Sequence, residues 1–409
     1  MARLKKLMAL VVLLCASTAG AVKVAIPSGI PGMEDASLSI NLQIQVWALS
    51  TENQSGDGMG WNTQVFLRRL RPQIAGDITK QLHFFVQLDS PNFGRFGTAG
   101  DPQGLAPGAG QTHVVVQDAQ AIYEPTPGVF IEAGELLLPL SHHQVQSTTS
   151  FVTLDIHSNT IRFPGATAPN QAANGLRELG VETRGWLLEK KLGFRLGVYN
   201  GVRGNPGTYD DTMGTSVTGL NPHSVPQFGG YLHWNFLDSE ERGWLYQGVY
   251  FNDKPILSVG VGAGFQPKAI RNVPGYTSGP QDWRALAADL YTAIPPATDQ
   301  EIIFQVDYYN YDFGTGNGNT GNGFFAELGY RYGQFQPQVS YEYFAANDPG
   351  PNASGAPFVR SADARIWTAG INWWFRRINS LKLEVAEMKL GSLNSPGIHQ
   401  IGAQWQLFF

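Results

Sequence analysis

Apolar and polar residues alternate along many short stretches of this chain, and this period of two constrains the fold more than any other feature. Between Asn41 and Trp47, the even positions are Leu, Ile and Val, and the odd positions before Trp47 are Asn, Gln and Gln. Successive side chains of a strand point to opposite faces, so the stretch predicts a strand with one apolar and one polar face. The pattern recurs at 82–89, 232–236, 257–266, 302–307, 335–343, 368–373 and 400–409.

Two kinds of connection join these predicted strands. Residues 333–334 form a short turn, whereas 90–112, 143–174, 202–225, 314–322 and 347–361 are long and polar. Short turns at one rim and long loops at the other are typical of a transmembrane β-barrel. A soluble β-sandwich also alternates, but its polar face would carry more charge than these Gln, Gly, Ser and Asn residues, since charged residues are only 15% of the chain. We therefore predict an all-β, antiparallel transmembrane barrel of about sixteen strands.

Aromatic residues gather near the ends of several predicted strands, as in the girdles that barrels place at membrane interfaces. They are Tyr308, Tyr309, Tyr311, Tyr330, Tyr332, Trp373, Trp374, Phe408 and Phe409. No stretch after the first residues has 18 consecutive apolar residues, so we expect no transmembrane helix. Closing the sheet into a ring would remove the unpaired backbone edges that lipid cannot solvate.

The first 21 residues have the pattern of a secretory signal peptide. Arg3, Lys5 and Lys6 precede an apolar run at 7–16, and Ala-Gly-Ala at 19–21 is a small-x-small cleavage site. We expect residues 22–36 to be a short lead-in and residues 37–409 to form one barrel domain. Cleavage would remove Cys15, the only cysteine, and would move the net charge from −5 to −8. Such a charge argues against nucleic acid as a partner.

Several motifs resemble those of the phosphate-selective porin O and P family, and the likeness extends over most of the chain. Phe-Leu-Arg-Arg-Leu-Arg at 66–71 resembles the family's Arg-Arg-x-Arg, and 81–89 resembles the strand that follows it. Gly-Glu-Leu-Leu-Leu-Pro-Leu-Ser at 134–141 resembles Gly-Gln-Phe-Lys-x-Pro-Phe-Ser. Arg-Glu-Leu-Gly at 177–180 and Gly-Val-Tyr-Asn-Gly at 197–201 resemble its Arg-Asp-x-Gly and Gly-x-Phe-Asn-Gly, and 367–372 fits as well.

The resemblance implies a sixteen-stranded outer-membrane porin of a Gram-negative-type bacterium, usually a homotrimer, with a loop near 141–175 folded into the pore. Its partners would be outer-membrane lipid and lipopolysaccharide. Phe409 resembles the terminal aromatic signal that the barrel-assembly machinery reads. The chain departs from the family at Glu135 and Leu137, where the family carries Gln and Lys, and it would keep only eight lysines after cleavage.

Parity also assigns charged side chains to the polar face of the strands, which would line the pore. The basic candidates for contact with anions are Arg69, Arg71, Arg184, Arg331, Arg376 and Lys382, and the acidic candidates are Asp89, Asp118, Glu178, Glu182, Asp307, Glu327, Glu342 and Glu384. A pore selects solutes by its width and by these charges. Arg69 and Arg71 could form a basic rung for an anion, or the charges could pair and brace the wall. Arg68 has the opposite parity, which predicts an outward position at an interface or a subunit contact.

We therefore predict a water-filled channel for passive diffusion of small hydrophilic solutes, anions such as phosphate among them. One alternative is a barrel enzyme of the lipase or protease kind, because Ser141 adjoins His142. The other is a plugged barrel with a structural or surface-binding role. Neighbouring histidines in a loop do not make a metal site without further ligands, so we expect neither a metal at His142 and His143 nor any cofactor.

Overall fold

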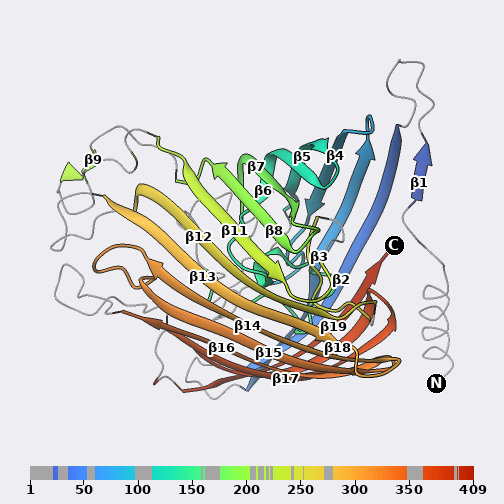
Figure 1. The fold of residues 1–409 in the computed structure, drawn as a ribbon. Coiled ribbons are helices and arrows are strands. Elements are labelled where there is room, and N and C mark those ends of the chain that lie inside the picture. Colours follow the sequence, from blue (N-terminus) through green and yellow to red (C-terminus); the bar gives the residue numbers. More distant parts are fainter. Residues whose placement is uncertain are drawn as a thin grey trace.

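The computed structural model describes residues 22–25, 36–52, 60–96, 113–157, 160–161, 176–202, 209–210, 216–217, 221, 224–240, 244–251, 253–270, 280–347, 363–390, 394 and 396–409. The predicted signal peptide lies outside these residues. Sixteen antiparallel strands close into a single barrel (Figure 1). They are β2 (Ser37–Glu52), β3 (Trp61–Asp77), β4 (Leu82–Asp89), β5 (Val115–Thr126), β6 (Val129–Leu137), β7 (Arg177–Leu187), β8 (Leu192–Tyr199), β11 (Gln227–Asn235), β12 (Ile256–Ile270), β13 (Gln281–Ile294), β14 (Gln300–Asp312), β15 (Gly321–Tyr332), β16 (Phe335–Ala346), β17 (Ala364–Arg376), β18 (Asn379–Leu390) and β19 (Ile398–Phe408).

The barrel closes where β19 pairs with β2. Residues 400–408 of β19 face residues 43–51 of β2, and Leu42 and Phe409 exchange two backbone hydrogen bonds at the end of this ladder. The short strand β1 (Val22–Ala25) pairs with the start of β2, beside the end of β19. Two further strands, β9 (Tyr209–Asp210) and β10 (Ser216–Val217), pair with each other. No helix in the described part of the chain is long and apolar enough to cross a membrane.

The two faces of the strands follow the alternation of the sequence. On β13, Leu286 points outward with 60% of its surface exposed, whereas Asp289 is buried inside the barrel. Strand β16 buries Gln336, Gln338 and Ser340 and turns its apolar parity outward. The outer surface is therefore apolar over the barrel wall, and the inner face carries the polar side chains.

Three of the aromatic residues expected at a membrane interface lie inside the barrel instead, so the prediction of a girdle was wrong for them. Tyr309, Tyr311 and Trp374 are almost fully buried. They have the inward parity of their strands, and inside the barrel they pack against other parts of the chain. Tyr330, Tyr332 and Trp373 are exposed on the outside, as predicted.

One rim carries mostly short turns, and the other carries the long loops. At the short-turn rim the connections are residues 78–81, 127–128, 188–191, 295–299, 333–334 and 377–378. Gly333 adopts a φ of 58°, which only a residue without Cβ adopts readily, and this allows the two-residue turn between β15 and β16. One connection at this rim, residues 236–255 between β11 and β12, is long.

Candidate functional site

The connection between β6 and β7 enters the barrel from the long-loop rim. We call its described residues, 138–157 and 160–161, the inner loop. Nearly all of its apolar side chains are fully buried, and it contains the short 3₁₀ helix η1 (His143–Val145). The loop therefore lies within the barrel and occupies part of its interior.

Carboxylates on strands β13 to β18 hold the inner loop by its backbone. Asp289 accepts a hydrogen bond from the His142 amide at 3.1 Å, and Asp307 accepts one from the His143 amide at 3.4 Å. In the same way Glu384 accepts from Leu154 at 3.1 Å and Glu342 accepts from Thr160 at 2.9 Å. A buried amide needs a partner, and a carboxylate is a strong one. We call this side of the barrel the acidic wall.

The opposite side, β2 to β5 with β7, carries arginines. The Arg71 Nε lies 2.7 Å from Asp89, and the Arg177 Nε lies 3.1 Å from Asp118. The Arg69 guanidinium donates to Gln45 at 2.7 Å and also to Asp155 of the inner loop. Arg68, Arg69, Arg71 and Arg177 together form what we call the arginine wall.

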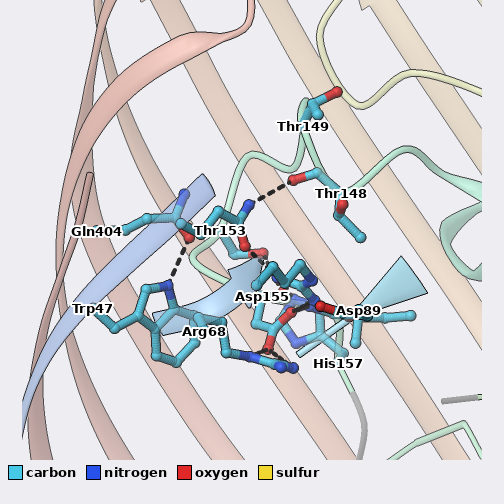
Figure 2. Close-up of polar contacts among 12 residues, drawn as sticks. Trp47, Arg68, Asp89, Thr148, Thr149, Thr153, Asp155, His157 and Gln404 are labelled. Carbon is cyan, nitrogen blue, oxygen red and sulfur yellow. Dashed lines mark hydrogen bonds and ion pairs between the residues drawn. The ribbon is translucent and has the colours of Figure 1, made fainter. Parts of the chain in front are cut away.

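Arg68 does not point outward, so its predicted place at an interface or subunit contact was wrong. The ladder between β2 and β3 shifts register here, because Gln45 pairs with Arg69 and Val46 pairs with Leu67. Arg68 is the extra residue of this β-bulge, and a bulge redirects a side chain that simple alternation would place outside. Its Nε donates to Asp155 at 2.7 Å (Figure 2).

Asp155 therefore accepts from two guanidiniums. Burial by itself raises the pKa of a carboxyl, but Arg68 and Arg69 outweigh this effect and hold the pKa of Asp155 below its ordinary value. The inner loop also reaches this wall through Thr148, whose hydroxyl accepts a hydrogen bond from Gln43 at 3.1 Å. The loop thus crosses the barrel between the two walls.

A second piece of chain enters the barrel from the short-turn rim. Residues 244–251, which we call the inner segment, belong to the connection between β11 and β12. Tyr246 forms a parallel bridge with Gln146: its amide donates to Val145 and its carbonyl accepts from Ser147, at 3.1 and 2.8 Å. Glu301 of the acidic wall accepts from the amides of Tyr250 and Phe251, both at 2.9 Å. The inner loop and the inner segment are therefore joined inside the barrel.

A cavity of about 840 Å³ lies between these inner pieces and the arginine wall. Its charged lining residues in the described part of the chain are Arg68, Arg69, Arg71, Arg177 and Asp89. Amide side chains of Asn41, Gln43, Gln73, Gln87, Gln117, Gln144, Gln146 and Gln247 also line it. Such a surface is wet and mostly cationic, so it suits a small hydrophilic solute of negative charge.

Three of the charged candidates from the sequence, Arg69, Arg71 and Asp89, line this cavity. The remaining candidates lie elsewhere, mostly in buried ion pairs or against the inner pieces. Arg184 pairs with Glu132 at 2.6 Å, Glu182 accepts from Tyr199 at 2.6 Å, and Lys382 donates to Thr153 at 2.9 Å. Asp307, Glu342 and Glu384 accept from the backbone of the inner loop, Asp118 pairs with Arg177, and Arg331 pairs with Glu301. Glu178 and Glu327 are buried, and Arg376 is exposed beside the turn between β17 and β18.

Several residues of the site were missed by the sequence analysis. Asp289 and Glu301 have the inward parity of their strands, so alternation could have found them. Arg177 has the outward parity of β7, which it shares with the exposed Leu179 and Val181, so alternation does not indicate its place beside the cavity. Asp155 and Glu240 lie in connections, where alternation gives no signal. Glu240 is buried and accepts from the Tyr250 hydroxyl at 2.8 Å.

Ser141, His142 and His143 contact residues of the barrel wall and of the connection between β11 and β12. The Ser141 hydroxyl is 2.7 Å from that of Tyr309, and His142 Nε2 is 2.7 Å from Glu240. His142 also stacks on Tyr291, with ring centroids 4.2 Å apart. Among the described residues, no group of three or more His, Cys, Asp or Glu side chains is placed to hold a metal ion.

Comparison with solved structures identifies the architecture. The outer-membrane channel DcaP of Acinetobacter baumannii superposes with a TM-score of 0.53 at 12% identity, covering 91% of this chain and 97% of that one. The chain has the porin fold. The anion-selective porin from Comamonas acidovorans shares this porin fold at a TM-score of 0.52 and 12% identity, over 91% and 100% of the two chains.

A further example of the porin fold is Salmonella typhi OmpF, solved in complex with daunomycin, with a TM-score of 0.51 and 14% identity over 91% and 98% of the two chains. No family model matches the sequence, and no curated protein matches it. These identities are low, so the comparisons establish the architecture and leave the solute to be argued from the site.

Proposed function

We propose that this protein is an outer-membrane porin that lets small hydrophilic solutes diffuse passively, with a preference for anions such as phosphate. The observation that carries the proposal is the distribution of charge inside the barrel. The cavity is bordered by four arginines and one carboxylate, Asp89, whereas acidic-wall carboxylates are occupied by the backbone of the inner loop and the inner segment. Fixed charges beside a passage attract counter-ions from solution.

The preference should be moderate, because the arginines are partly neutralised. Arg71 pairs with Asp89 and Arg177 pairs with Asp118, so each loses much of its field. Arg68 and Arg69 share one carboxylate, Asp155, and this leaves an excess of positive charge at that point. The resemblance of the arginine-bearing motif at 66–71 to the phosphate-selective porin O and P family supports phosphate as one of the anions.

The outer surface of the barrel supports a location in the outer membrane. Large apolar side chains such as Leu286, Val261 and Leu383 are half exposed on the outward parity. Only lipid or a partner would cover so many of them. Export by a signal peptide at 1–21, recognition of Phe409 by the barrel-assembly machinery, contact with lipopolysaccharide and assembly as a homotrimer belong to the same proposal.

The competing function is a plugged barrel with a structural or surface-binding role, because the inner loop and the inner segment fill much of the interior. Current through a planar bilayer separates the two. The porin predicts stepwise, ohmic currents for the purified protein, whereas a plugged barrel predicts none. We do not propose an enzyme, because the Ser141 hydroxyl contacts Tyr309 and His142 contacts Glu240, and both contacts hold the inner loop in place.

The anion preference is tested by replacing Arg69 and Arg71 together with alanine. In a salt gradient, the reversal potential should move toward cations, because the change removes two positive charges and leaves Asp89 without its partner. Arg376→Ala with Arg377→Ala is the matched control, since both side chains are exposed at the short-turn rim. An unchanged reversal potential in the Arg69 and Arg71 double variant would refute the role of the arginine wall.

A further inference from the structure

We propose that the inner segment, residues 244–251, narrows the pore, and that Trp244 with Phe85 sets the size limit of the constriction. The inference rests on the proposed porin function and goes beyond it. It states that the segment entering from the short-turn rim limits the size of the solutes that can pass. Phe85 lies on β4, and its ring centroid is 5.6 Å from that of Trp244. Both side chains line the cavity.

The aromatic contact joins two boundaries of the cavity, the barrel wall and the inner segment. Phe85 belongs to the barrel wall, two residues before Gln87 on β4. Trp244 belongs to the inner segment, and Leu245 and Gln247 after it also line the cavity. A solute in the cavity beside the arginine wall therefore meets this pair. Pore width at its narrowest point limits both conductance and solute size.

The inner segment is held firmly enough to act as a fixed boundary. Besides the bridge to the inner loop, the Gly248 amide donates to the Ser150 hydroxyl at 2.9 Å, and the Gly248 carbonyl accepts from Tyr291 at 3.0 Å. The Trp244 carbonyl accepts from Arg195 of β8. A Cβ on Gly248 would come within 2.5 Å of the Ser150 carbonyl, so the two pieces of backbone approach as closely as glycine allows.

A buried polar cluster joins the inner segment, the inner loop and the wall at one point. Glu240 lies 2.7 Å from His142 of the inner loop and accepts from Tyr250 of the inner segment and from Ser258 of β12, at 2.8 and 3.1 Å. The Tyr246 hydroxyl lies 2.9 Å from His233 Nδ1 of β11. Because the partners come from separate parts of the chain, the cluster fixes where Trp244 stands relative to Phe85.

The test compares three variants in planar bilayers, by single-channel conductance and by the size at which neutral polymers stop entering the pore. Trp244→Ala and Phe85→Ala each remove one side of the contact, and each should raise conductance by about 1.5-fold or more and admit larger polymers, since conductance follows pore cross-section. Trp234→Ala is the matched control. Trp234 lies on the outward parity of β11 and is 39% exposed, so its loss should leave both readings at the parental value.

The outcomes separate this inference from the porin proposal. A parent protein that conducts, with Trp244→Ala and Phe85→Ala both at the parental conductance and polymer limit, overturns the constriction at the inner segment and leaves the porin proposal intact. A parent that carries no current overturns the porin itself. If Trp244→Ala fails to fold, Phe85→Ala decides the question alone, because it opens the same contact from the barrel wall without touching the inner segment.

Discussion

At the scale of single residues, Asp155 both joins the inner loop to the arginine wall and affects the charge beside the cavity. It is one carboxylate between two guanidiniums, and it comes from the inner loop, whereas both arginines come from β3. It reduces the positive charge beside the cavity and at the same time fastens the loop to the arginine wall. The β-bulge at Arg68 makes this possible, because without the extra residue only one of the two arginines would face inward.

Replacing Asp155 with asparagine should increase the preference for anions, because it removes a negative charge beside the cavity and keeps the shape of the side chain. The reversal potential in a salt gradient should move in the direction opposite to that of the Arg69 and Arg71 double variant. Asp253→Asn is the control, since Asp253 also pairs with an arginine, Arg377, but does so at the short-turn rim. A shift of equal size in both variants would contradict the role of Asp155.

The selectivity of the parent should also depend on pH in a defined direction. Arg68 and Arg69 hold the pKa of Asp155 below its ordinary value, so the carboxylate stays charged as pH falls from 7 to about 4. Its contribution to the reversal potential should be constant over that range. At lower pH the carboxyl would take up a proton, and the parent should approach the anion preference of Asp155→Asn. The same variant should lack this acid transition.

At the scale of structural elements, the inner pieces are held by amide-to-carboxylate contacts. Glu301 is the strongest case, because it is fully buried, accepts from two amides of the inner segment and lies 3.2 Å from Arg331. Replacing Glu301 with alanine should lower the free energy of unfolding by about 3 kcal/mol, because it leaves a buried guanidinium and two amides without this partner. Urea unfolding followed by tryptophan fluorescence measures the loss.

Two further substitutions make that measurement specific. Glu301→Gln keeps an acceptor oxygen for the amides and should lose less stability than Glu301→Ala. Glu387→Ala removes an exposed carboxylate of β18 and should change the free energy of unfolding by less than about 0.5 kcal/mol. A Glu301→Ala variant as stable as Glu387→Ala would mean that the carboxylate does not anchor the inner segment.

The strands could be predicted from sequence because alternation is visible in each stretch by itself, without knowledge of distant segments. On β16 the buried Gln336, Gln338 and Ser340 follow the pattern, and Phe344 is the one apolar side chain with the same inward parity before the strand ends. The contents of the barrel could not be predicted in this way, since nothing in a strand shows which distant segment packs against it. Tyr309 and Trp374 lie inside and not at the predicted interface, because their partners belong to the inner pieces. Neither alternation nor composition indicates that part of residues 236–255 lies inside the barrel.

At the scale of the whole molecule, the architecture follows from two requirements. Backbone groups need hydrogen-bond partners, and apolar surface needs an apolar environment. Every strand of the barrel has a hydrogen-bonded neighbour on both sides, so the described sheet has no open edge along its wall. The apolar parity faces outward and the polar parity faces in, the reverse of a soluble protein of this size. This inversion is stable if lipid surrounds the barrel, and a stability measurement can distinguish lipid from water.

Leu286 and Leu188 provide the matched pair for this measurement. They have similar exposure, 60% and 64%, but Leu286 lies within β13 and Leu188 lies in a turn at the short-turn rim. In lipid vesicles, Leu286→Arg should cost about 2–4 kcal/mol of unfolding free energy, because the charge would sit near the bilayer midplane, and Leu188→Arg should cost about 0–1 kcal/mol at the interface. An outer surface in contact with water would make both substitutions nearly neutral. Equal costs would therefore show that the apolar outer surface does not face lipid.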